Sequence, residues 1–159
     1  MSRPPRDDGF TLVELLVTIS LMGTLMAIAV GAWSAWAQAS AHSGAAREIQ
    51  SAMRQAHQQA VTEGRATCFW FDDAADTYTV FRGRCTEPTK LKILGPVALP
   101  ARVRVTTPTF TSLAGTTMAG VSFQARGTGA PGDVRVTRDG SSKVYVLSVD
   151  WLTGRVSLS

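Results

Sequence analysis

The sequence predicts an α+β fold, in which one long N-terminal α-helix packs on a C-terminal antiparallel β domain. Residues 12–36 are almost entirely apolar, a run long enough for the first half of the helix to cross a membrane. Apolar residues then recur every three or four positions as far as residue 60, as they do on one face of a helix. After Gly64 apolar and polar residues alternate, which is typical of strands.

The size and charge of the chain limit the classes of protein it can belong to. Its 159 residues suffice for one domain and an anchor, and its formal net charge is +4. From residue 65 onward, twelve Lys and Arg stand against seven acids, a local excess of five positive charges. This excess is compatible with a polyanionic partner, but basic residues scattered over a solvated surface are the favoured interpretation.

The apolar segment 12–36 is predicted to anchor the chain in a membrane. No Asp, Glu, Lys or Arg occurs between residues 15 and 46, and Trp33 and Trp36 suit the far interface. Two arginines precede the segment, so the positive-inside rule places the N-terminus in the cytoplasm and the rest of the chain outside. Because the run exceeds the roughly 7–15 apolar residues of a secretory signal peptide, we expect the chain to stay in the membrane.

Glu14 stands inside this apolar run, where a carboxylate is costly. A charged side chain costs about 2.5–3.5 kcal/mol at the centre of a membrane helix. A residue retained at this cost needs a partner or a role. The simplest alternative places Glu14 at the headgroup interface, where water solvates its carboxylate.

The residues around Glu14 carry a specific resemblance. A short polar leader ends in Gly9 and is followed by "FTLVELLV". This arrangement resembles the class III signal of type IV prepilins and of type II secretion pseudopilins. The resemblance implies that residues 1–9 are a leader, that a prepilin peptidase cuts between Gly9 and Phe10, and that Phe10 becomes N-methylated. The two aspartates directly before Gly9 depart from the family, in which Lys or Arg is more usual.

The same resemblance assigns a role to Glu14. After cleavage Glu14 is the fifth residue of the mature chain, where the family carries its glutamate. Cleavage leaves a positive amine at Phe10, and in a filament the amine of a neighbouring subunit can neutralise the Glu14 carboxylate. We therefore expect Glu14 to act in assembly.

The helix is predicted to continue beyond the membrane and to occupy residues 10–64 in total. Apolar residues at 46, 49, 53, 56 and 60 form one face that packs on a sheet, and Gly64 ends the helix. His57 is expected on the surface of this helix. The glycines at 23, 31 and 44 are its predicted weak points.

Residues 65–159 are predicted to form an extracytoplasmic, antiparallel β domain of about seven strands. The first two, "RATCFWF" and "TYTVFRGRC", flank a turn at 72–76 and form a hairpin that holds both cysteines. Turn residues at 127–132, 139–140 and 153–154 separate later strands. The later strands are "ARVRVTT", "GVSFQA", "DVRVTR", "KVYVLSVDW" and "RVSLS".

The two cysteines, Cys68 and Cys85, fit one disulfide. Two thiols and two distant histidines have no zinc-ligand spacing. If the domain lies outside the cytoplasm we expect the pair to be bridged, which stabilises the fold by about 3 kcal/mol for a loop of this size. A pair of unbridged, buried thiols is the alternative.

The C-terminal half carries a second resemblance. The segments "SFQARGTG" and "TGRVSLS", together with "AREIQSAMRQA" in the helix, are similar to the H-type minor pseudopilins of the GspH/FimT family. This implies a structural subunit at or near the tip of a type II secretion pseudopilus or a type IV pilus. The implied partners are other major and minor pilins or pseudopilins, the prepilin peptidase, the inner-membrane assembly platform and membrane lipid.

Catalysis is poorly supported by the sequence. No Ser/His/Asp set is found, because both histidines fall in the predicted helix, away from strands and turns. "GTGAPGD" lacks the lysine and the following helix of a phosphate loop. Asp72, Asp73 and Asp76 could contribute to a Ca²⁺ site, but a turn with solvated carboxylates is favoured. We expect no enzyme activity, no metal and no cofactor.

Nucleic-acid binding is the main alternative function. Some members of this family bind DNA during uptake, through arginines near the C-terminal strands. Basic residues in the comparable region are Arg126, Arg135, Arg138, Lys143 and Arg155. The chain ends in "SLS" without a further arginine cluster, which argues against a DNA-receptor pilin.

Overall fold

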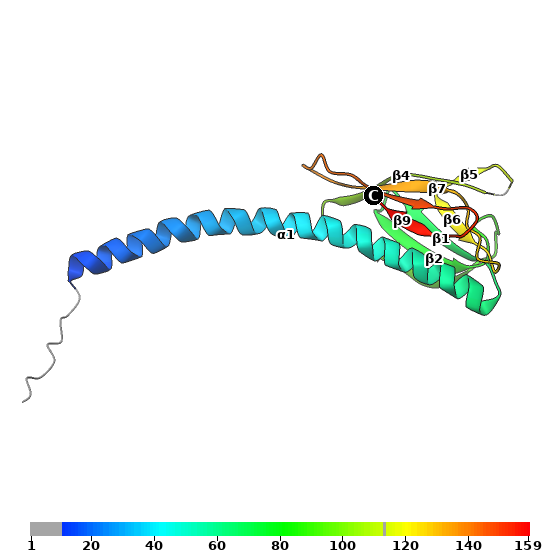
Figure 1. The fold of residues 1–159 in the computed structure, drawn as a ribbon, viewed down its shortest axis with the longest axis horizontal. Helices are drawn as coiled ribbons and strands as arrows, with labels where there is room; N and C mark the ends of the chain where they lie inside the picture. Colours follow the sequence, from blue (N-terminus) through cyan, green and yellow to red (C-terminus); the bar gives the residue numbers. More distant parts are fainter. Residues whose placement is uncertain (1–10, 113) are drawn as a thin grey trace, which may run out of the picture. The chain divides into compact units, whose positions relative to one another are not determined.

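The computed structural model describes residues 11–112 and 114–159. The chain falls into two compact units, Met1–Ala39 and Ser40–Ser159. One helix, α1 (Leu12–Glu63), belongs to both units, and nine strands are described in the second unit. The predicted α+β class is confirmed, because a long helix precedes an antiparallel β domain and packs on it (Figure 1).

The first half of α1 begins with a side-chain cap. The Glu14 N–H donates to Thr11 Oγ1 at 3.2 Å, which satisfies a donor that every helix leaves open at its N-terminus. An 18-residue window of mean hydropathy 2.2 has none of its surface buried, so this segment is long and apolar enough to cross a membrane. Its hydroxyl groups donate to carbonyls three or four residues earlier, which satisfies them without water. These hydroxyls belong to Thr18, Ser20, Thr24 and Ser34.

The second half of α1 ends as the sequence predicts, at Gly64. This residue has φ +63°, a left-handed conformation that glycine adopts without strain. The Arg65 N–H donates to Ala60 O at 3.2 Å and the Gly64 N–H to Val61 O at 3.4 Å, the paired bonds of a Schellman motif. As predicted, α1 is one continuous helix, and it does not break at the glycines 23, 31 and 44.

Two antiparallel sheets form the β domain (Figure 1). The four-stranded sheet has the order β3-β2-β1-β6 and the five-stranded sheet the order β5-β4-β7-β8-β9. The strands are β1 (Thr67–Asp72), β2 (Thr77–Arg82), β3 (Leu91–Ala98), β4 (Val103–Thr111), β5 (Thr117–Met118), β6 (Gly120–Phe123), β7 (Gly132–Arg138), β8 (Tyr145–Val149) and β9 (Val156–Leu158).

The prediction of about seven strands was wrong in two places. The strand β3 was missed because it contains Gly95 and Pro96, two residues that argue against a strand. The sheet tolerates these residues because β3 is an edge strand and its pairing with β2 has register shifts. The strand β5 is only two residues long and has no periodicity to detect. In addition, β2 ends at Arg82, so Cys85 lies beyond the β1–β2 hairpin rather than within it.

One hydrophobic core joins α1 to both sheets. From α1 it takes the predicted apolar face, in which Ile49 and Met53 are fully buried. Phe69 on β1 stacks on Tyr78 of β2 with ring centroids 4.9 Å apart. Phe71 of β1 stacks on Phe110 of β4 at 6.1 Å, which links the two sheets. The β domain therefore cannot separate from this part of the helix without exposing its core.

Candidate functional site

The surface of α1 as far as Ala39 is apolar and uncovered. Its large apolar side chains are half to four-fifths exposed, from Val17 at 50% to Leu12 at 79%. Trp33 and Trp36 contact one another with ring centroids 5.5 Å apart and remain exposed. An apolar surface this large requires lipid or another protein to cover it.

Glu14 is an exposed residue in the first turn of this apolar helix. It is the one acidic side chain of that turn, and its backbone is fixed by the Thr11 cap. The predicted cleavage site between Gly9 and Phe10 lies outside the described residues. Pairing of Glu14 with a neighbour's amine remains a prediction.

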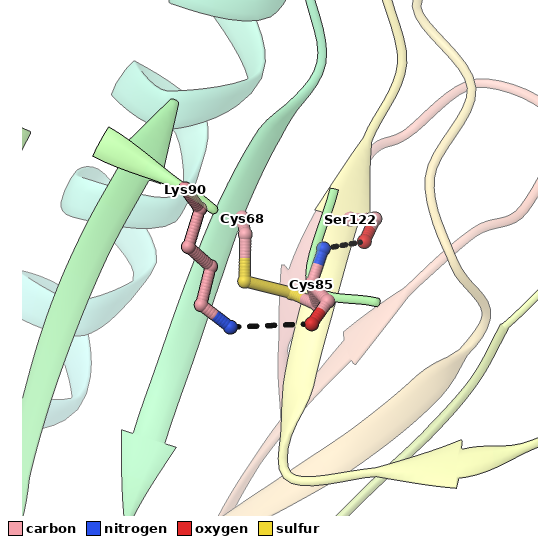
Figure 2. The surroundings of a disulfide bond; sticks show 4 residues. All are labelled: Cys68, Cys85, Lys90 and Ser122. Atoms are coloured by element: carbon pink, nitrogen blue, oxygen red, sulfur yellow. Dashed lines mark hydrogen bonds between the residues drawn. A yellow bond between two sulfur atoms is a disulfide. The ribbon is translucent and has the colours of Figure 1, made fainter. Parts of the chain in front are cut away.

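A disulfide joins Cys68 of β1 to Cys85, and no cysteine is left unpaired in the described chain (Figure 2). Cys85 belongs to residues 83–90, here named the strap, which follow β2 and cross the outer face of the four-stranded sheet. The Cys85 N–H donates to Ser122 Oγ on β6 at 2.9 Å, and Lys90 Nζ donates to Cys85 O at 3.2 Å (Figure 2). The strap is therefore fixed to β1 by a covalent bond and to β6 by a hydrogen bond.

Two aromatic rings and a glycine also contact the strap. Lys90 Nζ lies 4.9 Å from the centroid of the Trp70 ring and 5.2 Å from that of Phe81. A Cβ added at Gly120 would lie 2.7 Å from Trp70 Cε3 and 3.1 Å from Cys85 Sγ. The strap can approach the sheet this closely because position 120 is glycine.

Both histidines contact the β domain, which corrects the expectation that they stay away from strands and turns. His42 is buried, with Nε2 at 3.1 Å from Val136 O and its ring edge-on to Tyr145. His57 is half-buried, with Nε2 at 2.9 Å from Gly127 O and its ring edge-on to Phe123. Through these hydrogen bonds and ring contacts both histidines hold α1 on the sheets.

The sequence also missed two polar residues that fix β9 on α1. Gln50 Nε2 and Arg54 Nη2 donate to Val156 O at 3.3 and 3.0 Å. Their spacing of four residues places them on one side of the helix, beside its apolar face. That spacing was the available signal, but their partner is about a hundred residues away in the chain.

Two aspartates of the β1–β2 turn make structural hydrogen bonds, Asp72 within the turn and Asp76 to β4. Asp72 Oδ1 accepts the N–H groups of Ala74 and Ala75 at 3.1 and 3.0 Å. Asp76 Oδ1 accepts the Val105 N–H, and its Oδ2 lies 3.2 Å from Arg104 Nη1. Among the described residues no cluster of His, Cys, Asp or Glu is suited to a metal ion.

Arg104 also forms a surface ion pair with Asp139. Its Nε and Nη2 donate to the two carboxylate oxygens at 3.0 and 3.2 Å. These hydrogen bonds lower the pKa of Asp139 and raise the pKa of Arg104. Both side chains are exposed, so the pair orients the start of β4 with little effect on stability.

The basic residues considered for nucleic-acid binding do not form one surface. Arg135 and Arg138 are three residues apart on β7 in an unbroken register, so their side chains lie on opposite faces of the sheet. Lys143 follows β7 in the chain, after the Arg138 end of the strand. Its ammonium lies over the Tyr145 ring, 4.7 Å from the ring centroid. Of the remaining members, Arg126 is exposed in a turn after β6 and Arg155 is exposed directly before β9.

Comparison with known families identifies the chain. A family model described as type II transport protein GspH matches residues 45–153. The chain belongs to the GspH family. A prokaryotic N-terminal methylation motif matches residues 5–30. The GspH family is structural and not enzymatic, and this member is a minor pseudopilin or pilin of a type II secretion system or type IV pilus.

Solved structures share the fold of this GspH-family chain. The minor pseudopilin EpsH from the type 2 secretion system of Vibrio cholerae has a TM-score of 0.56 and 10% identity, covering 74% of this chain and 94% of its own. The type IV minor pilin FimU of Pseudomonas aeruginosa PAO1 has a TM-score of 0.51 and 19% identity, covering 74% and 87%. No curated protein sequence matches significantly.

Proposed function

We propose that this GspH-family chain is a minor subunit at or near the tip of a type II secretion pseudopilus or a type IV pilus. The observation that carries the proposal is a methylation motif at residues 5–30 that overlaps the exposed apolar first half of α1, whose second half packs on the β domain. Before assembly such a helix lies in the lipid bilayer, and in the filament the helices of other subunits cover it. The β domain is then displayed outside the filament core.

The proposal includes a processing step and a topology. A prepilin peptidase removes residues 1–9, and Phe10 is methylated. The N-terminus lies in the cytoplasm, the apolar half of α1 crosses the inner membrane, and the β domain lies in the periplasm. The Cys68–Cys85 disulfide supports this topology, because structural disulfides persist in oxidising compartments. The assembly platform and other pilins are the partners.

Mass spectrometry of the protein from its native membrane tests the processing step. We expect a chain that begins at methylated Phe10. An intact residue 1–9 leader on chains recovered from sheared filaments would contradict the proposed maturation.

The role of Glu14 is tested with Glu14→Gln, which keeps the shape of the side chain and removes its charge. A neutral amide is cheaper to bury than a carboxylate, so membrane insertion and leader cleavage should be retained. Incorporation into filaments should fall at least about tenfold, because a neighbour's ammonium is left unpaired in an apolar environment. Thr18→Val is the matched control, since Thr18 is exposed one turn later on the same side of α1.

The measurement is the crosslinking yield to other pilin subunits at equal membrane levels. We expect wild-type yield for Thr18→Val and a large loss for Glu14→Gln. Equal yields for Glu14→Gln and wild type would remove the assembly role of Glu14. We do not propose a DNA receptor, because the basic residues that suggested it lie on different faces and turns of the β domain.

A further inference from the structure

Two hollows lie side by side at the end of the β domain where α1 ends. One, named the basic cleft, has a volume of about 570 Å³ and is lined by Arg65, Arg82, Arg84 and Glu87 among others. The second, named the apolar pocket, has a volume of about 340 Å³ and includes Ala130, Pro131 and Trp151 in its wall. Arg84 and Gln124 line both hollows, so a single ligand can occupy the two together.

The basic cleft offers two arginines to a ligand. Arg82 is already paired with Glu63 at 2.9 Å. Arg65 and Arg84 are exposed, and the ion pairs found among residues 11–112 and 114–159 involve neither of them. Glu87 is the one acid in the lining, and with Arg82 neutralised by Glu63 the two remaining arginines leave a net charge of about +1 there. This charge suits a single carboxylate and not a polyanion, which requires several phosphate contacts.

The apolar pocket has an exposed aromatic wall held by a fixed turn. Trp151 and its neighbour Leu152 are each 60% exposed. Asp150 Oδ1 accepts the N–H groups of Leu152 and Thr153 and the Thr153 hydroxyl, at 3.1, 2.9 and 2.8 Å. The Trp151 carbonyl in turn accepts the Gly129 N–H at 3.1 Å. Exposed aromatic residues held in place in this way are typical of contact points between proteins.

The strap supplies the wall that the two hollows share. Arg84 and Thr86 flank Cys85 and both line the apolar pocket, while Glu87 lines the basic cleft. Because Cys85 is bonded to Cys68 and to Ser122 Oγ, the strap is held in place before any ligand arrives (Figure 2). A site fixed in advance loses less entropy on binding.

We propose that the two hollows form one docking site, named the distal site, for a segment of a neighbouring filament subunit. That segment carries a carboxylate, which Arg84 and Arg65 bind, beside a bulky apolar side chain, which enters the apolar pocket against Trp151. The inference rests on the proposed function as a filament subunit. It adds the place on the β domain at which a neighbouring subunit binds and the side chains that this neighbour presents.

The second half of α1 shows at which end of the β domain the distal site lies. The helix enters the second unit at Ser40 and ends at Glu63, which is about 35 Å further on at 1.5 Å per residue. The distal site is at the Glu63 end, as its lining by Gly64 and Arg65 requires. A subunit bound there contacts the end of the β domain at which α1 ends.

Photo-crosslinking in the native host tests the distal site in the full chain. The photoreactive residue p-benzoylphenylalanine replaces Leu152 at the rim, or Ala101 in the turn before β4 as the control position. The nine residues of β4 separate Ala101 from Thr111, which lines the apolar pocket, by about 30 Å. We expect an adduct with another pilin-like subunit from position 152 alone, joined to a peptide that has a carboxylate beside an apolar residue.

Charge reversal then tests the chemistry. Arg84→Glu should lower the adduct yield by about tenfold or more, because a charge-assisted hydrogen bond is replaced by repulsion. Trp151→Ala should lower it independently. Arg102→Glu is the matched control, because Arg102 is an exposed arginine in the turn before β4, and it should leave the yield unchanged.

Each other outcome overturns the docking site. These outcomes are an adduct equally strong from position 101, an adduct insensitive to Arg84→Glu and Trp151→Ala, and an adduct only with DNA or with a second copy of this chain. The amount of chain in sheared filaments is measured in parallel. Normal incorporation without the adduct overturns the distal site alone, whereas absence from the filaments overturns the proposed function and the distal site with it.

Discussion

Removal of the Cys68–Cys85 disulfide should destabilise the β domain by a predictable amount. The bond joins residues 17 positions apart, and closing a loop of that length in the unfolded chain is worth about 3 kcal/mol. Alanine is the suitable replacement at both positions, because Cys68 and Cys85 are 0% and 6% exposed and a serine hydroxyl there would need a partner. For a compact unit of the size of Ser40–Ser159, this loss corresponds to a fall in Tm of about 12 °C.

The assay is differential scanning calorimetry of the full chain in detergent micelles. Wild type without reductant should melt about 12 °C above the double variant Cys68→Ala/Cys85→Ala. A reducing agent should shift wild type by a similar amount and leave the double variant where it was. This control separates loss of the bond from loss of the buried sulfur atoms.

Two results would refute the reasoning. If wild type and the double variant melted within about 3 °C of each other, the loop-entropy argument would fail for this domain. If thiol labelling of the unfolded, non-reduced protein found two free sulfhydryls, the bond itself would be absent from the native protein.

Three further predictions concern the helix and the β8–β9 turn. Met53→Ala removes a fully buried side chain and should cost about 2–5 kcal/mol in urea unfolding, whereas an effect under 1 kcal/mol would contradict the packing of α1 on the sheets. Gly64→Ala forces a side chain into a left-handed conformation and should cost about 1 kcal/mol by the same measurement, although the site has open space; no loss would mean that φ is not positive there. The pKa of Asp150 is lowered first by the hydrogen bond from the Thr153 N–H, so its contribution to stability is present above the ordinary aspartate pKa of about 3.9 and is lost as the pH falls through the lower folded value. Asp150→Asn should remove that part of the acid dependence of Tm, and identical Tm profiles for the two proteins below pH 5 would exclude it.

Local sequence patterns were sufficient to predict α1 and the methylation motif. The apolar run from residue 12, the three- and four-residue spacing to Ala60 and the glycine at 64 each report a property of one continuous segment. The GspH family match and the methylation motif then confirmed the family. Most strands were also predictable. One face of each is buried, so apolar and polar residues alternate along its sequence.

The strands that were missed had no such pattern. The strand β3 carries four consecutive exposed residues, from Leu91 to Leu94, and its Gly95-Pro96 pair is characteristic of a turn. It exists as a strand because β2 supplies a hydrogen-bonding edge next to it. Pairing between strands, and not the propensity of the segment, decided its conformation.

The sequence alone determined that this chain is a pilin-like protein with a long helix, apolar in its first half, followed by a β domain. Those features depend on neighbours within a few residues. Only the tertiary structure decided which distant groups meet: His57 with Gly127, Arg54 with Val156, and the strap with β6. It also placed Arg135 and Arg138 on opposite faces and brought Arg84 and Trp151 into the lining of one pocket. Such contacts depend on sheet register and on the path of the loops, which no short stretch of sequence encodes.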